Sequence, residues 1–312
     1  MFDLVYLVSY LRSTVRLAVP LGFAALGEGF LEQAGSLNIG LEGLMLTGAW
    51  AGVIGAHFAG SPWAGLGLAI LLGLAIAALE AAVCVHLHCN EVVTGIAINV
   101  LGLGLTSYGY RMVFGITGAA AQVPTFRGFP IPLLSDLPII GPVLFNQPLL
   151  LYAMIAAAFG LWLILTKTSW GLDVKASGED PWVAEAEGAN VYRIRFLTFL
   201  LAGTLAASGG AFISLHNVSQ FFDGMTGGRG FIALAIVVVG RWHPLGILGV
   251  SALFGASEAL GLALQARLGL KAPYHLLMMV PFLITMIILP LASGRKAAPA
   301  ALGTGYERGT GA

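Results

Sequence analysis

Long apolar runs separated by short polar connections make up most of this chain. A run of about 20 apolar residues is long enough to cross a bilayer. We therefore predict an all-α polytopic membrane protein with about 8–10 transmembrane helices. The first 16 residues are apolar but too short to span, so we place them along the membrane interface. The expected spans are 17–33, 40–58, 62–86, 92–114, 149–166, 196–215, 230–242, 244–265 and 274–292.

Several of these runs are interrupted by Gly or Pro, and 230–242 is short. Broken or re-entrant helices at membrane depth usually line a cavity, because the freed backbone groups need partners. A weak internal repeat fits this pattern: in residues 35–50 and again in residues 224–240, a Gly-rich polar segment leads into an apolar segment. Internal repeats of this kind are common in transporters, where the substrate path lies between the repeats.

Composition supports the membrane assignment. The 312 residues are 58% hydrophobic and only 10% charged, whereas soluble domains carry roughly 25% charged residues. The formal net charge is zero, so no bulk electrostatic argument indicates a nucleic-acid partner. Two cysteines, Cys84 and Cys89, are too few for a disulfide framework. The chain starts without a basic region and a small-residue cleavage site, so no signal peptide is expected.

The polar segment 171–195 stands between two apolar runs, so it lies in water at one membrane face. It contains a plausible short helix, with Asp180 as N-cap, Pro181 at the first position and Gly188 just past the end. Two helical turns are not stable alone in water. Since Trp182 is also costly to expose, we expect this helix to dock into a partner protein.

Basic residues set the orientation. Lys and Arg gather in and beside the polar segment and again in the C-terminal tail, and the positive-inside rule places both in the cytoplasm. The Pro- and Gly-rich loop 115–148 is expected on the extracytoplasmic side, and the tail 295–312 is expected to be disordered. The transmembrane domain is 1–294. The parity of the segments between the two basic groups does not close, so either one of them is a hairpin or partial crossing or one span has the wrong bounds.

Ionisable residues within the apolar runs usually face the bundle interior or water. Interhelical hydrogen bonds or a position near the lipid headgroups are the favoured interpretation for Glu28, Glu80, Arg111 and Arg241, whereas Glu42 is open between a structural and a functional role. The stretch from Cys84 to Glu91 carries two Cys and two His, but it stands alone and at the end of a span. We therefore expect no metal site there.

No sequence motif of an enzyme is present. The chain lacks GxxxxGK[ST], GxSxG and HExxH, which carry phosphate binding, nucleophilic hydrolysis and zinc hydrolysis respectively. We expect no cofactor and no ATP hydrolysis by this chain.

Four motifs occur in order over roughly residues 17–290: GSLNIGLEGLMLTGAWAG, EVVTGIAINVLGLGLTSYGYR, GLDVKASGEDPWVAEAEGANVYRIRF and DGMTGGRGFIALA. Together they resemble the permease subunits of bacterial ABC importers of the branched-chain amino acid and simple-sugar type. The NIGLEG form with GMTGGRGFIALA is most similar to the subgroup associated with nucleoside uptake. The resemblance implies a bacterial inner-membrane protein that forms half of a translocation pathway.

The resemblance also implies partners: a cytoplasmic ABC ATPase, a second homologous permease and an extracytoplasmic substrate-binding protein. Residues 171–195 would be the coupling segment that meets the ATPase, although WVAEAEGAN departs from the expected pattern around Trp182. The implied coupling residues are Gly178, Glu179, Asp180, Pro181, Trp182, Glu185 and Gly188.

Two other sets of residues follow from the interpretation as an importer permease. Asn38, Glu42, Asn99 and Glu258 are candidates for the translocation pathway or its immediate support. His216, Asn217, Gln220, Phe222 and Asp223 follow the 196–215 span, at the mouth where the binding protein would dock. The alternatives are a simple-sugar ABC permease and an ion-coupled transporter that uses Glu42 or Glu258 as its ion site.

Overall fold

The computed structural model describes residues 4–115, 122–132, 134–135, 140–268, 283, 286 and 298–308. Nearly all of this is helix. Three π-helical segments, η1 (Ala82–His86), η2 (Gly141–Phe145) and η3 (Ile213–Val218), and two short paired strands, β1 (Phe129–Pro130) and β2 (Asn146–Gln147), complete it. The α-helices are α1 (Leu4–Gln33), α2 (Leu41–Ala59), α3 (Pro62–Ala81), α4 (Glu91–Phe114), α5 (Leu149–Lys167), α6 (Ser169–Glu179), α7 (Pro181–Ala186), α8 (Val191–Phe212), α9 (Arg229–Val239) and α10 (Pro244–Leu268).

Six helical segments of the described residues are long and apolar enough to cross a membrane. The chain is therefore an all-α polytopic membrane protein, as the hydropathy pattern predicts. The expected span 274–292 lies outside the described residues, apart from positions 283 and 286. The six segments are Tyr6–Gln33, Pro62–His86, Glu91–Phe114, Leu149–Lys167, Val191–Val218 and Pro244–Gln265.

The start of the chain corrects one expectation. Residues 4–16 do not form a separate interfacial segment, because α1 continues from Leu4 to Gln33 as one helix of 30 residues. Tyr10 in this part donates a hydrogen bond to the carbonyl of Ala256 in α10 at 3.0 Å. The helix is long because its first turns pack along α10, a contact that hydropathy alone does not reveal.

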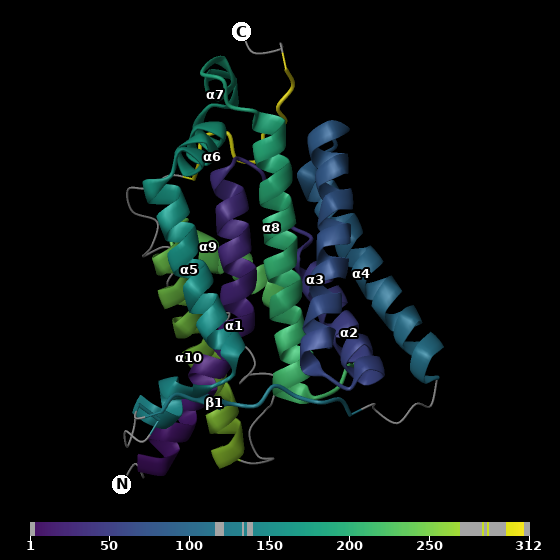
Figure 1. Ribbon diagram of the computed structural model, residues 1–312, viewed down its shortest axis with the longest axis vertical. Helices are drawn as coiled ribbons and strands as arrows, with labels where there is room; N and C mark the ends of the chain where they lie inside the picture. Colours follow the sequence, from purple (N-terminus) through teal and green to yellow (C-terminus); the bar gives the residue numbers. More distant parts are fainter. Residues whose placement is uncertain are drawn as a thin grey trace.

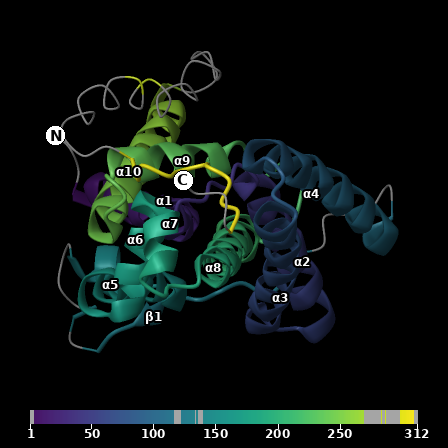
Figure 2. The same ribbon diagram turned by 90° about the horizontal axis from the view of Figure 1, so that it is seen from above.

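Helices α1 and α8 stand at the centre of the bundle (Figures 1 and 2). They contact each other, and α8 also packs against α2 and α3. Close approach relies on small residues: a side chain on Gly210 of α8 would strike the backbone of Met45 in α2. Figure 2 shows α4 on the outside of the bundle, and many of its apolar side chains are exposed, including Val93, Val100 and Met112.

The two ends of the bundle differ. Helices α6 and α7 lie at one end together with residues 298–308, which we call the C-terminal segment (Figure 1). The backbone N–H of Ala301 donates to the carbonyl of Gly178 at 2.9 Å. The coupling segment and the tail therefore share one end, as their basic residues predict. The expectation of a disordered tail does not fit residues 298–308, where Ala301 and Tyr306 are buried.

The opposite end carries the described parts of the loop 115–148. The N–H of Val123 donates to the carbonyl of Ser219, and that of Phe126 to Leu215, both at 3.2 Å. Strand β1 lies near this end (Figure 1). The coupling segment and this loop are thus separated by the length of α5 and α8.

Candidate functional site

The connection between α1 and α2 is held by carboxylates from three helices. The N–H of Asn38 donates to Glu28 Oε1 at 2.8 Å, and the Asn38 amide donates to Glu80 Oε2 at 2.8 Å. Leu37 N–H donates to Glu91 Oε2 at 2.8 Å. Asn38, Glu28 and Glu80 have no exposed surface. Asn38 is therefore a support of this connection, and Glu28 and Glu80 make the structural hydrogen bonds that the sequence favours.

Asn99 of α4 fixes the first turn of α2. Its Oδ1 accepts from Gly43 N–H at 2.7 Å, and its Nδ2 donates to the carbonyl of Ile39 at 2.9 Å. The backbones approach closely here: a Cβ on Gly43 would lie 2.5 Å from the carbonyl oxygen of Ile98. Asn99 is half-buried, and it orients α2 against α4.

Glu42 joins the start of α2 to the start of α9. Its Oε1 accepts from Thr226 Oγ1 at 2.6 Å and from Gly228 N–H at 2.8 Å, and its Oε2 accepts from Gly230 N–H at 2.7 Å. A carboxylate at a helix N-terminus satisfies free N–H groups and interacts favourably with the helix dipole. Glu42 thus takes the place of an N-cap for α9, whose own N-cap, Gly228, makes no side-chain bond.

Glu258 of α10 is tied to the same place. It forms an ion pair with Arg229, the first residue of α9, and both side chains are about one-fifth exposed, at 23% and 21%. Helix α9 has 11 residues, a length of about 16 Å that is too short to cross a bilayer. Its length fits the partial crossing that the sequence leads us to expect. We call residues 38–43 and 226–230 the helix-start junction; all four predicted pathway residues lie in it or bond to it.

The short helix α7 forms where the sequence predicts a coupling helix. Asp180 Oδ1 accepts from Trp182 N–H and Val183 N–H, both at 3.1 Å. Pro181 opens α7, and Gly188 follows with a φ of +95°, which glycine adopts without strain. Helix α6, which precedes α7, is not among the expected elements, although the capping hydroxyl of Thr168 marks its start.

The two sides of α7 have different surroundings. Trp182 is half-buried and packs against Tyr306, with ring centroids 5.9 Å apart. Glu185 accepts from the Tyr306 hydroxyl and pairs with Arg308. These two residues therefore contact the chain's own tail, so Trp182 is partly covered without a partner protein. Gly178 and Pro181 are also buried, whereas Glu179, Asp180, Val183, Ala186, Glu187 and Gly188 are exposed.

The ionisation of these groups reflects their contacts. Hydrogen bonds from Tyr306 and Arg308 lower the pKa of the Glu185 carboxyl. Burial, together with the nearby Glu185 carboxylate, raises the pKa of Tyr306 to about 12. Hydrogen bonding to Glu185 raises the pKa of Arg308. At neutral pH the contact therefore joins a carboxylate, a neutral phenol and a guanidinium.

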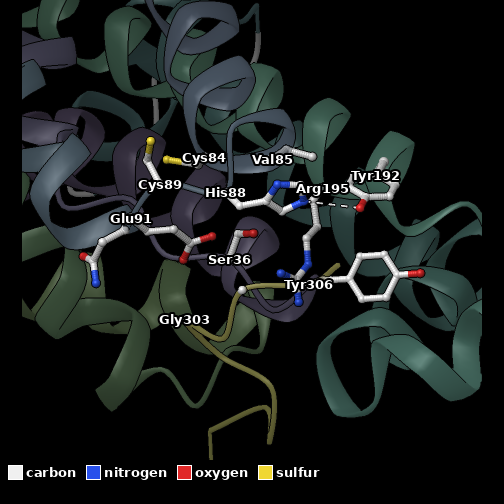
Figure 3. A pocket seen from close by; sticks show the side chains of 12 residues that line it. Ser36, Cys84, Val85, His88, Cys89, Glu91, Tyr192, Arg195, Gly303 and Tyr306 are labelled. Atoms are coloured by element: carbon white, nitrogen blue, oxygen red, sulfur yellow. Dashed lines mark hydrogen bonds between the residues drawn. The ribbon is translucent and has the colours of Figure 1, made fainter. Parts of the chain in front are cut away.

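A polar cavity of about 220 Å³ lies beside the C-terminal segment (Figure 3). Arg195 lies within it between Ser36 and Tyr306, and His88 bonds the Tyr192 hydroxyl at 3.3 Å. Cys84 and Cys89 are both free thiols. The described residues contain no group of three or more His, Cys, Asp or Glu side chains placed to hold a metal ion.

The predicted docking residues lie at the end opposite α7. His216 shares a hydrogen bond of 3.0 Å with the carbonyl of Phe126. Asp223 accepts from Ser107 at 2.9 Å and pairs with Arg111 at 3.4 Å. Phe222 is 48% exposed, and Asn217 and Gln220 are half-buried. His216 lies beside the loop 122–126, whereas Asp223 lies against α4; we call the stretch 216–223 the rim.

Comparison with known proteins identifies relatives over the whole chain. Residues 10–289 match the family described as "Branched-chain amino acid transport system / permease component". The guanosine ABC transporter permease protein NupQ of Bacillus subtilis is 34% identical over 98% of this chain and 99% of that protein. The "Putative glucose ABC transporter permease protein TsgC13" of Haloferax volcanii is 34% identical over 96% and 97%. The nucleoside ABC transporter permease protein NupC of Lactococcus lactis is 33% identical over 93% of both chains.

Proposed function

This chain belongs to the branched-chain amino acid transport system / permease component family, and on that premise we propose that it is the permease subunit of an ATP-driven nucleoside importer. The observation that carries the nucleoside proposal is the end-to-end similarity to a guanosine permease, at 34% identity. The chain forms half of the translocation pathway in the bacterial inner membrane. It carries no ATPase motif, so a partner subunit hydrolyses ATP.

The partners follow from this assignment. A cytoplasmic ABC ATPase meets α7, a second homologous permease completes the pathway, and an extracytoplasmic binding protein delivers substrate. The exposed residues of α7 support the first contact, since a two-turn helix that projects from the bundle suits a groove on another protein (Figure 1). The rim with His216, Asn217, Gln220, Phe222 and Asp223, at the other end, is our proposed docking site for the binding protein.

The helix-start junction is our proposed moving part of the pathway. Glu42 and Glu258 hold the start of α9, and Asn38 and Asn99 hold the start of α2. ATP binding moves the coupling helices, and the permease switches as packed rigid bodies between inward-facing and outward-facing states. Polar groups at the junction offer a nucleoside weak contacts, and weak contacts permit release.

A sugar is the second candidate substrate, because the similarity to TsgC13, a protein named for glucose, is equally high at 34%. An ion-coupled mechanism finds less support. Such a mechanism needs an available carboxylate, whereas Glu42 accepts from three donors and Glu258 pairs with Arg229.

The test is affinity purification of the tagged chain in mild detergent, followed by mass spectrometry. We expect an ATPase, a second permease and a binding protein to co-purify, and the binding protein to retain guanosine rather than glucose. A chain that purifies alone, under conditions where a control ABC importer stays assembled, contradicts the proposal. A binding protein that retains only glucose would replace the nucleoside with a sugar.

A further inference from the structure

The coupling helix α7 presents two different faces. One face, with Trp182 and Glu185, is covered by the C-terminal segment of the same chain. The other side carries Val183, which is 57% exposed, and the exposed Glu187 four positions further on at the end of α7, while the exposed Glu179 ends the preceding helix α6. A partner can bind the covered parts of Trp182 and Glu185 only if the tail first leaves.

The C-terminal segment packs closely against α7. Tyr306 is only 4% exposed, and its ring lies 5.9 Å from that of Trp182 and 5.2 Å from that of Tyr192. Its hydroxyl donates to Glu185 Oε2, while Arg308 pairs with Glu185 Oε1. Both oxygens of this carboxylate are therefore occupied by the tail, and Glu185 has the role of an anchor.

The same segment also bonds the bundle itself. Gly303 N–H donates to the carbonyl of Gly35 at 3.0 Å, in the connection that leads into α2. Arg195 of α8, which is 4% exposed, donates to the carbonyl of Thr304 at 2.8 Å. With the bond from Ala301 to Gly178, the C-terminal segment links α6, α7 and α8 to the α1–α2 connection.

We propose that the C-terminal segment positions the coupling helix, with Tyr306 and Arg308 as positioning residues, so that the ATPase contacts the opposite face. This inference rests on the proposed function. The exposed face then requires an ATPase surface with an apolar hollow for Val183 and a basic residue beside it, because the exposed Glu187 lies one helical turn after Val183. Motion of α7 passes through Gly303 to the start of α2.

Charge-reversal variants, measured in the assembled complex, distinguish the roles of the two faces of α7. Glu185→Arg faces Arg308 with a like charge, and we expect the ATP hydrolysed per substrate carried to rise about threefold to tenfold. The double variant Glu185→Arg/Arg308→Glu restores the pair and should return within about twofold of wild type. Glu187→Arg is the matched control: it weakens ATPase binding, and Arg308→Glu does not rescue it. A double variant no better than Glu185→Arg alone overturns the proposal.

A second readout needs no ATPase and no substrate. The two native thiols are first removed with Cys84→Ala and Cys89→Ser. Ala301→Cys then introduces a single thiol at a position where the native residue is 6% exposed. We expect slow maleimide labelling in membranes that lack the ATPase, and at least fivefold faster labelling after Glu185→Arg. Equal rates would overturn the positioning role. If labelling is slow but the protein does not transport nucleosides, the proposed function is contradicted and the positioning role is not.

Discussion

The helix-start junction and the contact between α7 and the C-terminal segment both depend on glutamates, but in opposite ways. At the junction, Glu42 accepts from three donors, two of them backbone N–H groups. At the tail contact, Glu185 accepts from two side chains, and its partner Arg308 is 66% exposed. Glu42 is half-buried; charge-assisted bonds to partly buried N–H groups are costly to break, whereas exposed ion pairs contribute little. We therefore expect the helix-start junction to stay bonded and to move as one unit, whereas the tail contact is the part that can separate.

The largest effect is expected at Glu42. Glu42→Ala leaves the N–H groups of Gly228 and Gly230 without an acceptor, at about 1–3 kcal/mol for each. We expect the free energy of unfolding of the purified protein in detergent to fall by about 3 kcal/mol and transport to be lost. Glu258→Gln, which keeps most of its contacts with Arg229, is the control and should cost clearly less. Similar losses of stability for both variants would contradict the role of Glu42 as the N-cap of α9.

Asn38 gives the second largest effect. Asn38→Ala removes the donor to Glu80 and leaves a fully buried carboxylate with one bond fewer, at about 2–3 kcal/mol. Asn38→Asp is expected to be worse, because it places a third carboxylate beside Glu28 and Glu80. Thermal unfolding monitors both variants. Asn99→Ala, at a half-buried site, should lower the stability less than either variant of Asn38. A larger loss for Asn99→Ala would contradict the distinction between buried and accessible polar groups.

Two glycines on α4 provide a matched pair. A Cβ on Gly102 would lie 2.7 Å from the Cα of Gly43 in α2, whereas a Cβ on Gly104 meets nothing within 4 Å. Gly102→Ala should therefore separate α2 from α4 and cost about 1–3 kcal/mol. Gly104→Ala should be neutral or stabilising by up to about 1 kcal/mol. Unfolding temperatures of the two variants check this; equal values would contradict the close helix contact.

The smallest effect is the pH dependence of the tail contact. The pKa of Glu185 is lowered on folding, so its contribution is present above the ordinary glutamate pKa and is lost as pH falls through the lowered value. The pKa of Tyr306 is raised to about 12, so its contribution is present below the ordinary tyrosine value of about 10 and is lost as pH rises through about 12. Between about pH 5 and 10, labelling of Ala301→Cys, corrected for thiolate fraction, should stay constant. A change near neutral pH would contradict these contacts.

Local signals in the sequence predict the fold class, most of the spans and the coupling helix. Apolar runs define spans, and the order of Asp180, Pro181 and Gly188 defines a short helix, because each of these depends on near neighbours in sequence. Glu42 stands out for the same reason, as a charge inside an apolar run. The weak internal repeat between residues 35–50 and 224–240 corresponds to two helix starts, and they meet at Glu42.

Contacts between distant segments cannot be predicted in this way. Nothing near Tyr306 in the sequence indicates that it packs on Trp182, which lies 124 positions earlier, and the small polar residues around it suggest disorder. Likewise, residues 4–16 join α1 because they pack on α10, and α9 is held by a carboxylate from α2. A pattern in one segment cannot name the distant segment that it contacts, so only the three-dimensional arrangement reveals these contacts.

The most direct test of the account is uptake by proteoliposomes that contain this chain, its partner permease, the ATPase and the binding protein. We predict accumulation of labelled guanosine that requires ATP on the ATPase side, persists with an uncoupler and is abolished by Glu42→Ala. Guanosine accumulation that proceeds without ATP and collapses with the uncoupler would contradict the account.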